Sequence, residues 1–172
     1  MRPDLDIIQQ WVKPGDHVLD LGCGDGTLLD FLQRERQATG FGLEINPDHI
    51  TTCMSKGVAV IEQNLDTQGL DNFDDGMFDI VLMTQALQAV RRPDRVLDEM
   101  LRVGREGIVT FPNFAYWRLR WGLALSGRMP ESEALPYKWY NTPNIRLCTF
   151  KDFEALCRQK GIRIKSRRVV DG

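Results

Sequence analysis

Short apolar runs of strand length alternate along the chain with stretches in which apolar residues recur at helical spacing. This alternation predicts an α/β fold, a doubly wound and mainly parallel sheet with helices on both faces. A chain of 172 residues suits one domain with one substantial core. The predicted strands cover residues 17–21, 40–45, 58–61, 78–83, 107–111 and 162–166.

Polar residues and glycines mark the ends of the predicted helices. Asn46 followed by Pro47 is typical of an N-cap with proline at the first helical position. Thr149 and Asp152 have the spacing of a capping box, with Asp in place of Glu. Three glycines each follow a helical segment and precede a strand, and we assign them as C-caps: Gly57, Gly104 and Gly161.

Residues 114–148 interrupt the alternation of strands and helices. The stretch contains three tryptophans and three tyrosines, interspersed with prolines. Long ordered insertions in compact α/β domains usually form lids or binding surfaces. We therefore predict that residues 114–148 are an insertion that serves as a lid or docking surface. The alternative is a helix and loop that only cap the sheet edge.

The end of the sequence indicates an incomplete sheet. After the last predicted strand the chain reaches Val169, Val170, Asp171 and Gly172, where a hairpin turn would begin. We therefore expect a final antiparallel strand to be missing. A shortened chain, a longer natural chain or a partner chain that supplies the strand would each explain this.

Composition excludes several classes of function. The net charge of −2 and the pI near 5.7 provide no broad basic face for nucleic acid. Four cysteines without a CxxC pair, together with only two histidines, do not predict a metal site. The N-terminus has no signal-peptide pattern, and no apolar run approaches the ~20 residues that span a bilayer. We therefore expect a cytoplasmic protein with free thiols, and the oligomeric state stays open.

The strongest indication of ligand binding is a glycine run that follows the first predicted strand and opens a helix. Glycines lack a Cβ and let a ligand approach the backbone, and the amides at a helix start attract an electron-rich group. In an open parallel sheet, ligands bind at this carboxyl edge of the strands. The run is Asp20-Leu21-Gly22-Cys23-Gly24-Asp25-Gly26.

The spacing of these glycines favours S-adenosylmethionine over NAD. A dinucleotide fingerprint is G-x-G-x-x-G, whereas here the third glycine comes one residue sooner and Thr27 takes its place. Asp20, two residues before the first glycine, would attract the ammonium of S-adenosylmethionine and repel a pyrophosphate. A P-loop is excluded because no Gly-Lys-Ser/Thr follows the run.

Residues after the next strands complete the predicted site. Glu44 ends the second strand, where a carboxylate can accept hydrogen bonds from both ribose hydroxyls. Asn64 follows the third strand and can accept from the adenine amino group, while Leu65 covers the ring. Thr84 and Gln85 follow the fourth strand on the substrate side. The full predicted cofactor-binding set is Asp20, Gly22, Cys23, Gly24, Asp25, Gly26, Glu44, Ile45, Asn64, Leu65, Thr84 and Gln85.

These features together resemble the class I S-adenosylmethionine-dependent methyltransferases, which also carry D-x-G-x-G-x-G, a distal glutamate and a segment like Phe78-Asp79-Ile80-Val81. Within that superfamily the whole chain is similar to the methionine biosynthesis protein MetW family. One departure from the methyltransferases is Asn64, where they usually carry Asp. The motifs that distinguish the MetW family are Thr84-Gln85-Ala86-Leu87-Gln88, Phe111-Pro112-Asn113-Phe114, Gly127-Arg128-Met129-Pro130, Leu135-Pro136-Tyr137-Lys138-Trp139-Tyr140-Asn141-Thr142-Pro143-Asn144-Ile145-Arg146 and Thr149-Phe150-Lys151-Asp152-Phe153.

The resemblance implies a cytoplasmic role in methionine biosynthesis, together with a homoserine O-acyltransferase of the MetX type. It does not by itself imply methyl transfer, and the sequence indicates no catalytic base. His17 begins a strand and His49 lies in the first turn of a helix, where structural roles are expected. Two hypotheses follow. The chain is a nucleoside-binding partner or regulator of the acyltransferase, or it is a methyltransferase acting on a small metabolite.

Overall fold

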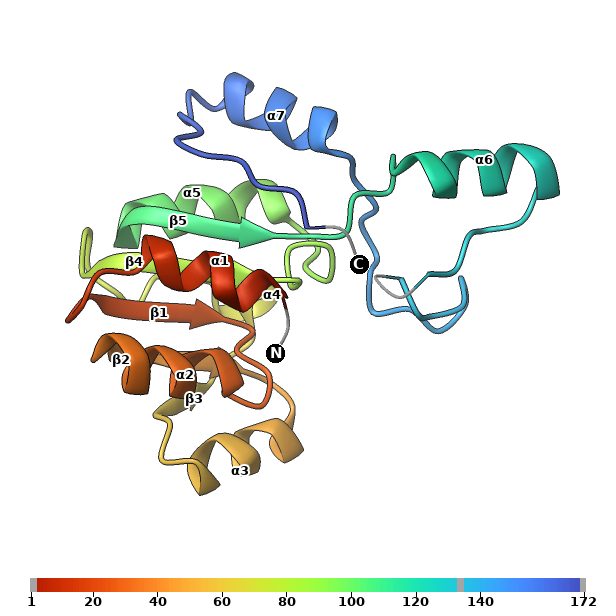
Figure 1. The fold of residues 1–172 in the computed structure, drawn as a ribbon. Helices are drawn as coiled ribbons and strands as arrows, with labels where there is room; N and C mark the ends of the chain where they lie inside the picture. The colour runs from red at the N-terminus through yellow and green to blue at the C-terminus, as the bar shows by residue number, and fades with distance from the viewer. Residues whose placement is uncertain (1–2, 133–134, 171–172) are drawn as a thin grey trace.

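A computed structural model describes residues 3–132 and 135–170. Its elements alternate as the sequence predicts and form a sheet covered by helices (Figure 1). The strands are β1 His17–Leu21, β2 Thr39–Glu44, β3 Val60–Glu62, β4 Phe78–Thr84 and β5 Gly104–Thr110. The helices are α1 Pro3–Trp11, α2 Thr27–Arg36, α3 Pro47–Ser55, α4 Leu65–Gln68, α5 Pro93–Val103, α6 Trp117–Ser126 and α7 Phe150–Gln159.

The five strands are parallel and lie in the order β3-β2-β1-β4-β5. The chain moves outward from β1 to β3 on one side and then returns to β4 on the other. The carboxyl ends of β1 and β4 therefore flank the point where the winding reverses, which is where open α/β sheets bind ligands. The glycine run follows β1 directly and lies at this point.

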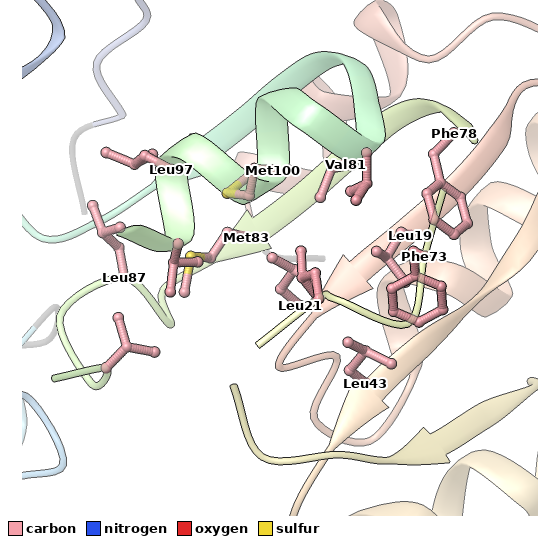
Figure 2. Packing of buried hydrophobic residues seen from close by; sticks show 14 residues of the cluster. Leu19, Leu21, Leu43, Phe73, Phe78, Val81, Met83, Leu87, Leu97 and Met100 are labelled. Atoms are coloured by element: carbon pink, nitrogen blue, oxygen red, sulfur yellow. The ribbon is translucent and has the colours of Figure 1, made fainter. Parts of the chain in front are cut away.

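Each face of the sheet buries its own apolar cluster. On one face, residues of β1, β4 and β5 pack against α1, α2 and the end of α3. On the other face, leucines of β1 and β2 pack with Phe73, Phe78 and the buried side of α5 (Figure 2). Because both faces are covered, the central strands β1 and β4 are mostly apolar and buried, as parallel strands usually are. The predicted fold class is confirmed.

Two predicted helix starts are confirmed in atomic detail. The side chain of Asn46 accepts the Asp48 amide at 2.9 Å and caps α3 ahead of Pro47. At α7, the Thr149 hydroxyl accepts the Asp152 amide, and the Asp152 carboxylate accepts the Thr149 amide at 3.0 Å. The reciprocal bonds of a capping box therefore form with the shorter Asp side chain.

Several strand bounds differ from those predicted, most clearly for β5, which begins three residues early at Gly104. This glycine is not a left-handed C-cap, because its φ of −119° and ψ of 146° are extended. A Cβ at Gly104 would lie 2.4 Å from Val81 Cγ2. Glycine is therefore favoured here by the close approach of Val81 on the neighbouring strand. Gly57 and Gly161 do have positive φ, as predicted for C-caps.

The prediction of a strand at 162–166 is wrong: residues 162–170 form no strand. Two ion pairs connect this segment to the rest of the chain: Lys165 with Glu106 at 2.5 Å, and Arg167 with Glu154 at 2.5 Å. A strand needs a ladder of backbone bonds to a neighbour. Within the described residues, β5 pairs with β4 alone, and no antiparallel strand lies beside it.

Residues 111–149 leave the carboxyl end of β5 and return to α7. They contain α6, which lies away from the sheet in Figure 1. A backbone hydrogen bond joins the two ends of this segment, because the Phe114 amide donates to the Cys148 carbonyl at 3.1 Å. Among the described residues, no helix is long and apolar enough to cross a membrane.

Candidate functional site

The glycine run forms a tight loop that only glycine accommodates easily. Gly22, Gly24 and Gly26 have φ values of 73°, 56° and 74°, in the left-handed region that L-residues avoid. The amides of Gly22 and Cys23 both donate to the Leu43 carbonyl, at 2.9 and 3.1 Å. These bonds extend the pairing of β1 with β2 and hold the loop over the carboxyl edge of the sheet.

Glu44 anchors this loop from the end of β2. Its Oε2 accepts the amide of Gly24 at 2.8 Å, and its Oε1 accepts the amides of Ile45 and Asn46 at 2.7 and 2.9 Å. The residue is 9% exposed. The structure thus brings together the glycine loop and the predicted ribose-binding carboxylate, which lie twenty residues apart in sequence.

Gly24 leaves space that a side chain would fill. A Cβ built at Gly24 meets no described atom within 4 Å, whereas one at Gly26 would lie 2.8 Å from Cys53 Sγ. Both polar groups of Gly24 are engaged, because its amide bonds Glu44 and its carbonyl accepts the Cys53 thiol at 3.2 Å. Packing therefore does not explain glycine at position 24, and this open space beside Glu44 suits a ligand that must approach the backbone.

Asp25 fastens the loop to the end of α3. Its Oδ2 accepts from Lys56 Nζ at 2.9 Å, and its Oδ1 accepts the Thr27 amide at 3.1 Å at the start of α2. Lys56 also donates to the Asp25 carbonyl at 2.9 Å. The Lys56 ammonium lowers the pKa of Asp25 to about 2, with further help from Thr27. Asp25 is therefore ionised at neutral pH, and its carboxylate accepts hydrogen bonds from Thr27 and Lys56.

Asp20 and Cys23 lie beneath the loop. Asp20 is 1% exposed, in register with Gly42 of β2 and Leu82 of β4. Burial, and then the negative charge of Asp20, raise the pKa of the Cys23 thiol. A Cβ at Gly42 would lie 2.3 Å from Cys23 Sγ, so this sulfur fills the space that Gly42 leaves. Cys23 is thus a buried, protonated thiol and not a nucleophile.

Thr84 and Gln85, predicted to lie on the substrate side of the site, are the last residue of β4 and the first residue after it. Gln85 has a φ of 57°, which is uncommon for a residue other than glycine. Its amide donates to the Thr110 carbonyl at 2.9 Å, so the turn after β4 is tied to the end of β5. A Cβ at Gly22 would lie 3.0 Å from Ala86 Cβ, which places this turn against the glycine loop. Backbone strain of this kind gathers at functional sites.

Asn64 has a local role besides the predicted one. Its Oδ1 accepts the Asp66 amide at 2.9 Å and caps α4, the short helix that begins at Leu65. A carbonyl oxygen has two lone pairs, so adenine recognition would require this oxygen to accept a second bond. The Gln63 amide donates to the Glu44 carbonyl at 3.1 Å, which keeps Asn64 beside the end of β2.

Comparison with known proteins assigns the family. The sequence model of the family described as Methionine biosynthesis protein MetW matches residues 2–172. The chain belongs to the MetW family. A relative from Rhodopirellula baltica, a bifunctional methionine biosynthesis protein MetXA/MetW, is 36% identical over 173 residues. The match covers 95% of this MetW-family chain but 28% of the fused relative.

Other relatives of this MetW-family chain are methyltransferases. The demethylmenaquinone methyltransferase of Symbiobacterium thermophilum is 29% identical, over 90% of this chain and 71% of its own length. A SAM-dependent methyltransferase from Aquifex aeolicus has a TM-score of 0.66 at 15% identity, covering 95% of this chain and 81% of its own. The plantazolicin methyltransferase BpumL in complex with SAH has a TM-score of 0.64 at 17% identity, covering 89% and 58%. These solved structures show that the fold is the Rossmann-like fold of class I methyltransferases.

Three residues outside the predicted cofactor-binding set position the glycine loop and the turn after β4 in this MetW-family chain. Lys56 fixes Asp25, Thr110 fixes Gln85, and Ala86 contacts the loop at Gly22. Lys56 follows the predicted helix after Asn46, but its sequence position gives no indication that it reaches back to the loop. Positive φ at Gln85 has no signature in the sequence either, because glutamine is not a residue that favours it.

The two histidines take no part in a metal site. His17 stacks on Phe78 with ring centroids 5.0 Å apart, at the amino end of β1 and away from the glycine loop. His49 Nδ1 lies 3.7 Å from Glu44 Oε2, on the ribose side of the predicted site. Within 3–132 and 135–170, no group of three or more His, Cys, Asp or Glu is placed to hold a metal ion.

A cavity of about 1810 Å³ begins at Gln85 and continues along β5 to α6. Trp11 of α1, Ile108 of β5 and Leu119 of α6 contribute to its walls, and the extended segment 162–170 lies along it. Pockets for small molecules usually measure about 300–1,000 Å³. This cavity exceeds that range, and among the described residues no strand covers the edge of β5 beside it.

Proposed function

We propose that this MetW-family protein binds S-adenosylmethionine or S-adenosylhomocysteine and acts in methionine biosynthesis as a partner or regulator of a homoserine O-acyltransferase of the MetX type. The nucleoside part of the proposal is supported by one observation above the others. Gly24 presents open space beside the Glu44 carboxylate, at the winding reversal of the sheet. In the proposed complex, Glu44 accepts the ribose hydroxyls while the glycine loop admits the methionine part.

The other predicted residues have supporting roles in this proposal. Asp20 contributes negative charge from beneath the loop, which favours a ligand with an ammonium and a sulfonium. Asn64 and Leu65 receive the adenine, with the Asn64 side-chain oxygen accepting from both Asp66 and the adenine amino group. Thr84 and Gln85 face the sulfonium side. The four free cysteines suit a reducing compartment such as the cytoplasm.

The acyltransferase part of the proposal is supported by the fused relative. In Rhodopirellula baltica a MetXA/MetW protein includes a region 36% identical to this chain. Fusion holds two domains at high effective concentration, so their separate counterparts are expected to associate. The partner is therefore proposed to be a homoserine O-acyltransferase, and regulation would follow from nucleoside binding at the adjoining site.

The second candidate is a methyltransferase that acts on a small metabolite. The cavity that begins at Gln85 favours it, because a substrate there would adjoin the sulfonium side of the site. Proton removal from a hydroxyl or amine substrate would need a positioned base. Neither histidine lines that cavity, and nothing singles out a base among the acids and tyrosines that do, such as Tyr116 and Glu131, so we place this candidate second.

Calorimetry with S-adenosylmethionine, S-adenosylhomocysteine and NAD tests the nucleoside site. We expect S-adenosylmethionine and S-adenosylhomocysteine to bind and NAD not to bind. If neither of the first two binds, the proposal is overturned. Copurification with the homoserine acyltransferase, and acylation assays with and without this chain, test the partner role. Methyl incorporation into a metabolite, without a complex or an effect on acylation, would establish the second candidate instead.

A further inference from the structure

We propose that α6 docks on its partner through one exposed stripe, Trp117, Trp121 and Leu125, and that the receiving surface is an apolar groove with an acidic rim on the homoserine acyltransferase. This inference rests on the proposed function, because it takes that enzyme as the partner. The arm is defined here as residues 114–148, which include α6.

The stripe follows from helical geometry. Residues four apart lie one above the other on a helix, so positions 117, 121 and 125 form a single row. These three side chains are 57%, 61% and 82% exposed. A contiguous exposed row of this kind marks an interaction surface more often than a solvated face.

The remaining apolar positions of α6 do not need this stripe for folding. Leu119 is buried and lines the cavity together with Gly122 and Ser126, which lie on a different face of the helix. That face is turned toward the cavity. The stripe side chains belong to neither buried apolar cluster, so they can be changed without opening the core.

The size of the stripe suits a protein interface. An aromatic side chain buries about 150–250 Å² when fully covered, and one partner of a standard interface buries about 800 Å². Two tryptophans and a leucine thus supply a large share of such a surface. Trp139 and Tyr140, also in the arm, are 74% and 64% exposed. Tryptophan, tyrosine and arginine are the residues that dominate binding energy at interfaces.

The charge of the arm determines the chemistry of its partner surface. Residues 114–148 contain five cations and two acids, a net charge of +3, whereas the whole chain carries −2. At 100° per residue, Arg118 and Arg120 flank the stripe on its two sides. Arg118 also lies over the Trp117 ring at 5.4 Å. A groove rimmed by carboxylates complements this arrangement, and an equally basic second copy of the arm does not.

The position of the arm connects docking to the nucleoside site. The Gln85 amide donates to the Thr110 carbonyl at 2.9 Å, and four residues later the chain enters the arm. Gln88, in the same turn, donates from Nε2 to the Pro112 carbonyl at 3.0 Å and to Cys148 Sγ at 3.4 Å. Both ends of the arm are therefore fixed to the turn that faces the sulfonium side of the proposed site.

The test measures binding of the full chain to the homoserine acyltransferase of the same organism. Trp121→Ala and Leu125→Ser should each weaken the complex, the tryptophan change by about 30-fold or more. Met77→Ser changes an exposed apolar side chain just before the amino end of β4, whereas the arm leaves from the carboxyl end of β5, and it should have no effect on the complex. The double change Arg118→Glu and Arg120→Glu should weaken binding most at low salt, and the single charge reversal Lys13→Glu, outside the arm, should have little effect.

S-adenosylmethionine affinity of every variant is measured alongside, so that loss of folding is not mistaken for loss of docking. If the wild type binds the acyltransferase and the stripe variants bind equally well, this inference is overturned while the proposed function stands. If the wild type forms no complex with the acyltransferase, both this inference and the proposed partner role fail. A wild-type dimer that the stripe changes dissociate, or binding to phosphatidylglycerol vesicles that they abolish, would each replace the acyltransferase as the occupant.

Discussion

Glu44 accepts the backbone amide of Gly24 at 2.8 Å, so a carboxylate at the end of β2 fixes the loop that follows β1. The same carboxylate accepts two further amides, those of Ile45 and Asn46. All three partners are donors. The loop and its proposed ribose ligand therefore depend on one ionised side chain.

Glu44→Gln should weaken both the loop and nucleoside binding. Glutamine places an NH₂ group where one carboxylate oxygen now accepts an amide, so two donors would face each other. A buried donor left without an acceptor costs about 1–3 kcal/mol, which denaturant unfolding would detect. Calorimetry should show S-adenosylmethionine affinity lower by about 10-fold or more. Glu62→Gln is the control, because exposed Glu62 lies beside Glu44 on β3. Equal affinity in both variants would remove Glu44 from the site.

Gly24→Val should abolish nucleoside binding, because a branched side chain would occupy the open space beside Glu44. The positive φ adds a conformational cost of about 1–2 kcal/mol for any L-residue. Gly76→Val separates the two effects, since Gly76 has a φ of 65° and equally open surroundings before β4. Unfolding free energies of the two variants should fall by similar amounts, while only the first loses binding in calorimetry. Retained binding in Gly24→Val would place the ligand elsewhere.

The Asp25 carboxyl should titrate near pH 2, because Lys56 lowers its pKa from 3.8. A lowered folded-state pKa stabilises the protein above the unfolded value and ceases to do so as pH falls through the folded one. Lys56→Met should therefore flatten the loss of stability between about pH 4 and pH 2. Carboxyl NMR of that variant should return the pKa toward its ordinary range. Arg92→Met, which frees Asp94 of a similar pKa shift, should leave Asp25 unchanged.

Cys23 should resist alkylation in the folded protein, because burial and the Asp20 charge raise the pKa of its thiol. Only the thiolate reacts, and little forms at about pH 8 when the pKa is raised. Mass spectrometry after iodoacetamide treatment should find Cys23 labelled only after unfolding in guanidinium. Fast labelling of Cys23 in the native state would contradict the burial of the loop interior.

Particular elements explain where sequence-based prediction succeeded. The caps at Asn46 and Thr149 were predictable because each bond joins residues at most three apart. The segment at 162–166 was mispredicted because its apolar residues favour a strand only when another strand offers backbone partners. Gly104 was assigned the wrong conformation, since its proximity to Val81 arises from sheet packing.

The sequence by itself determined the alternation of elements, the parallel sheet, the glycine loop and the carboxylate that ends β2, because these depend on local periodicity and on chirality rules for chain connections. Only the tertiary structure decided that Glu44 accepts the Gly24 amide and that Lys56 donates to Asp25. It also decided that Gln85, with its positive φ, donates its amide to Thr110. Each of these contacts joins residues at least twenty positions apart. Which residues meet in these contacts depends on how the sheet and helices pack, and a local sequence pattern carries no information about that packing.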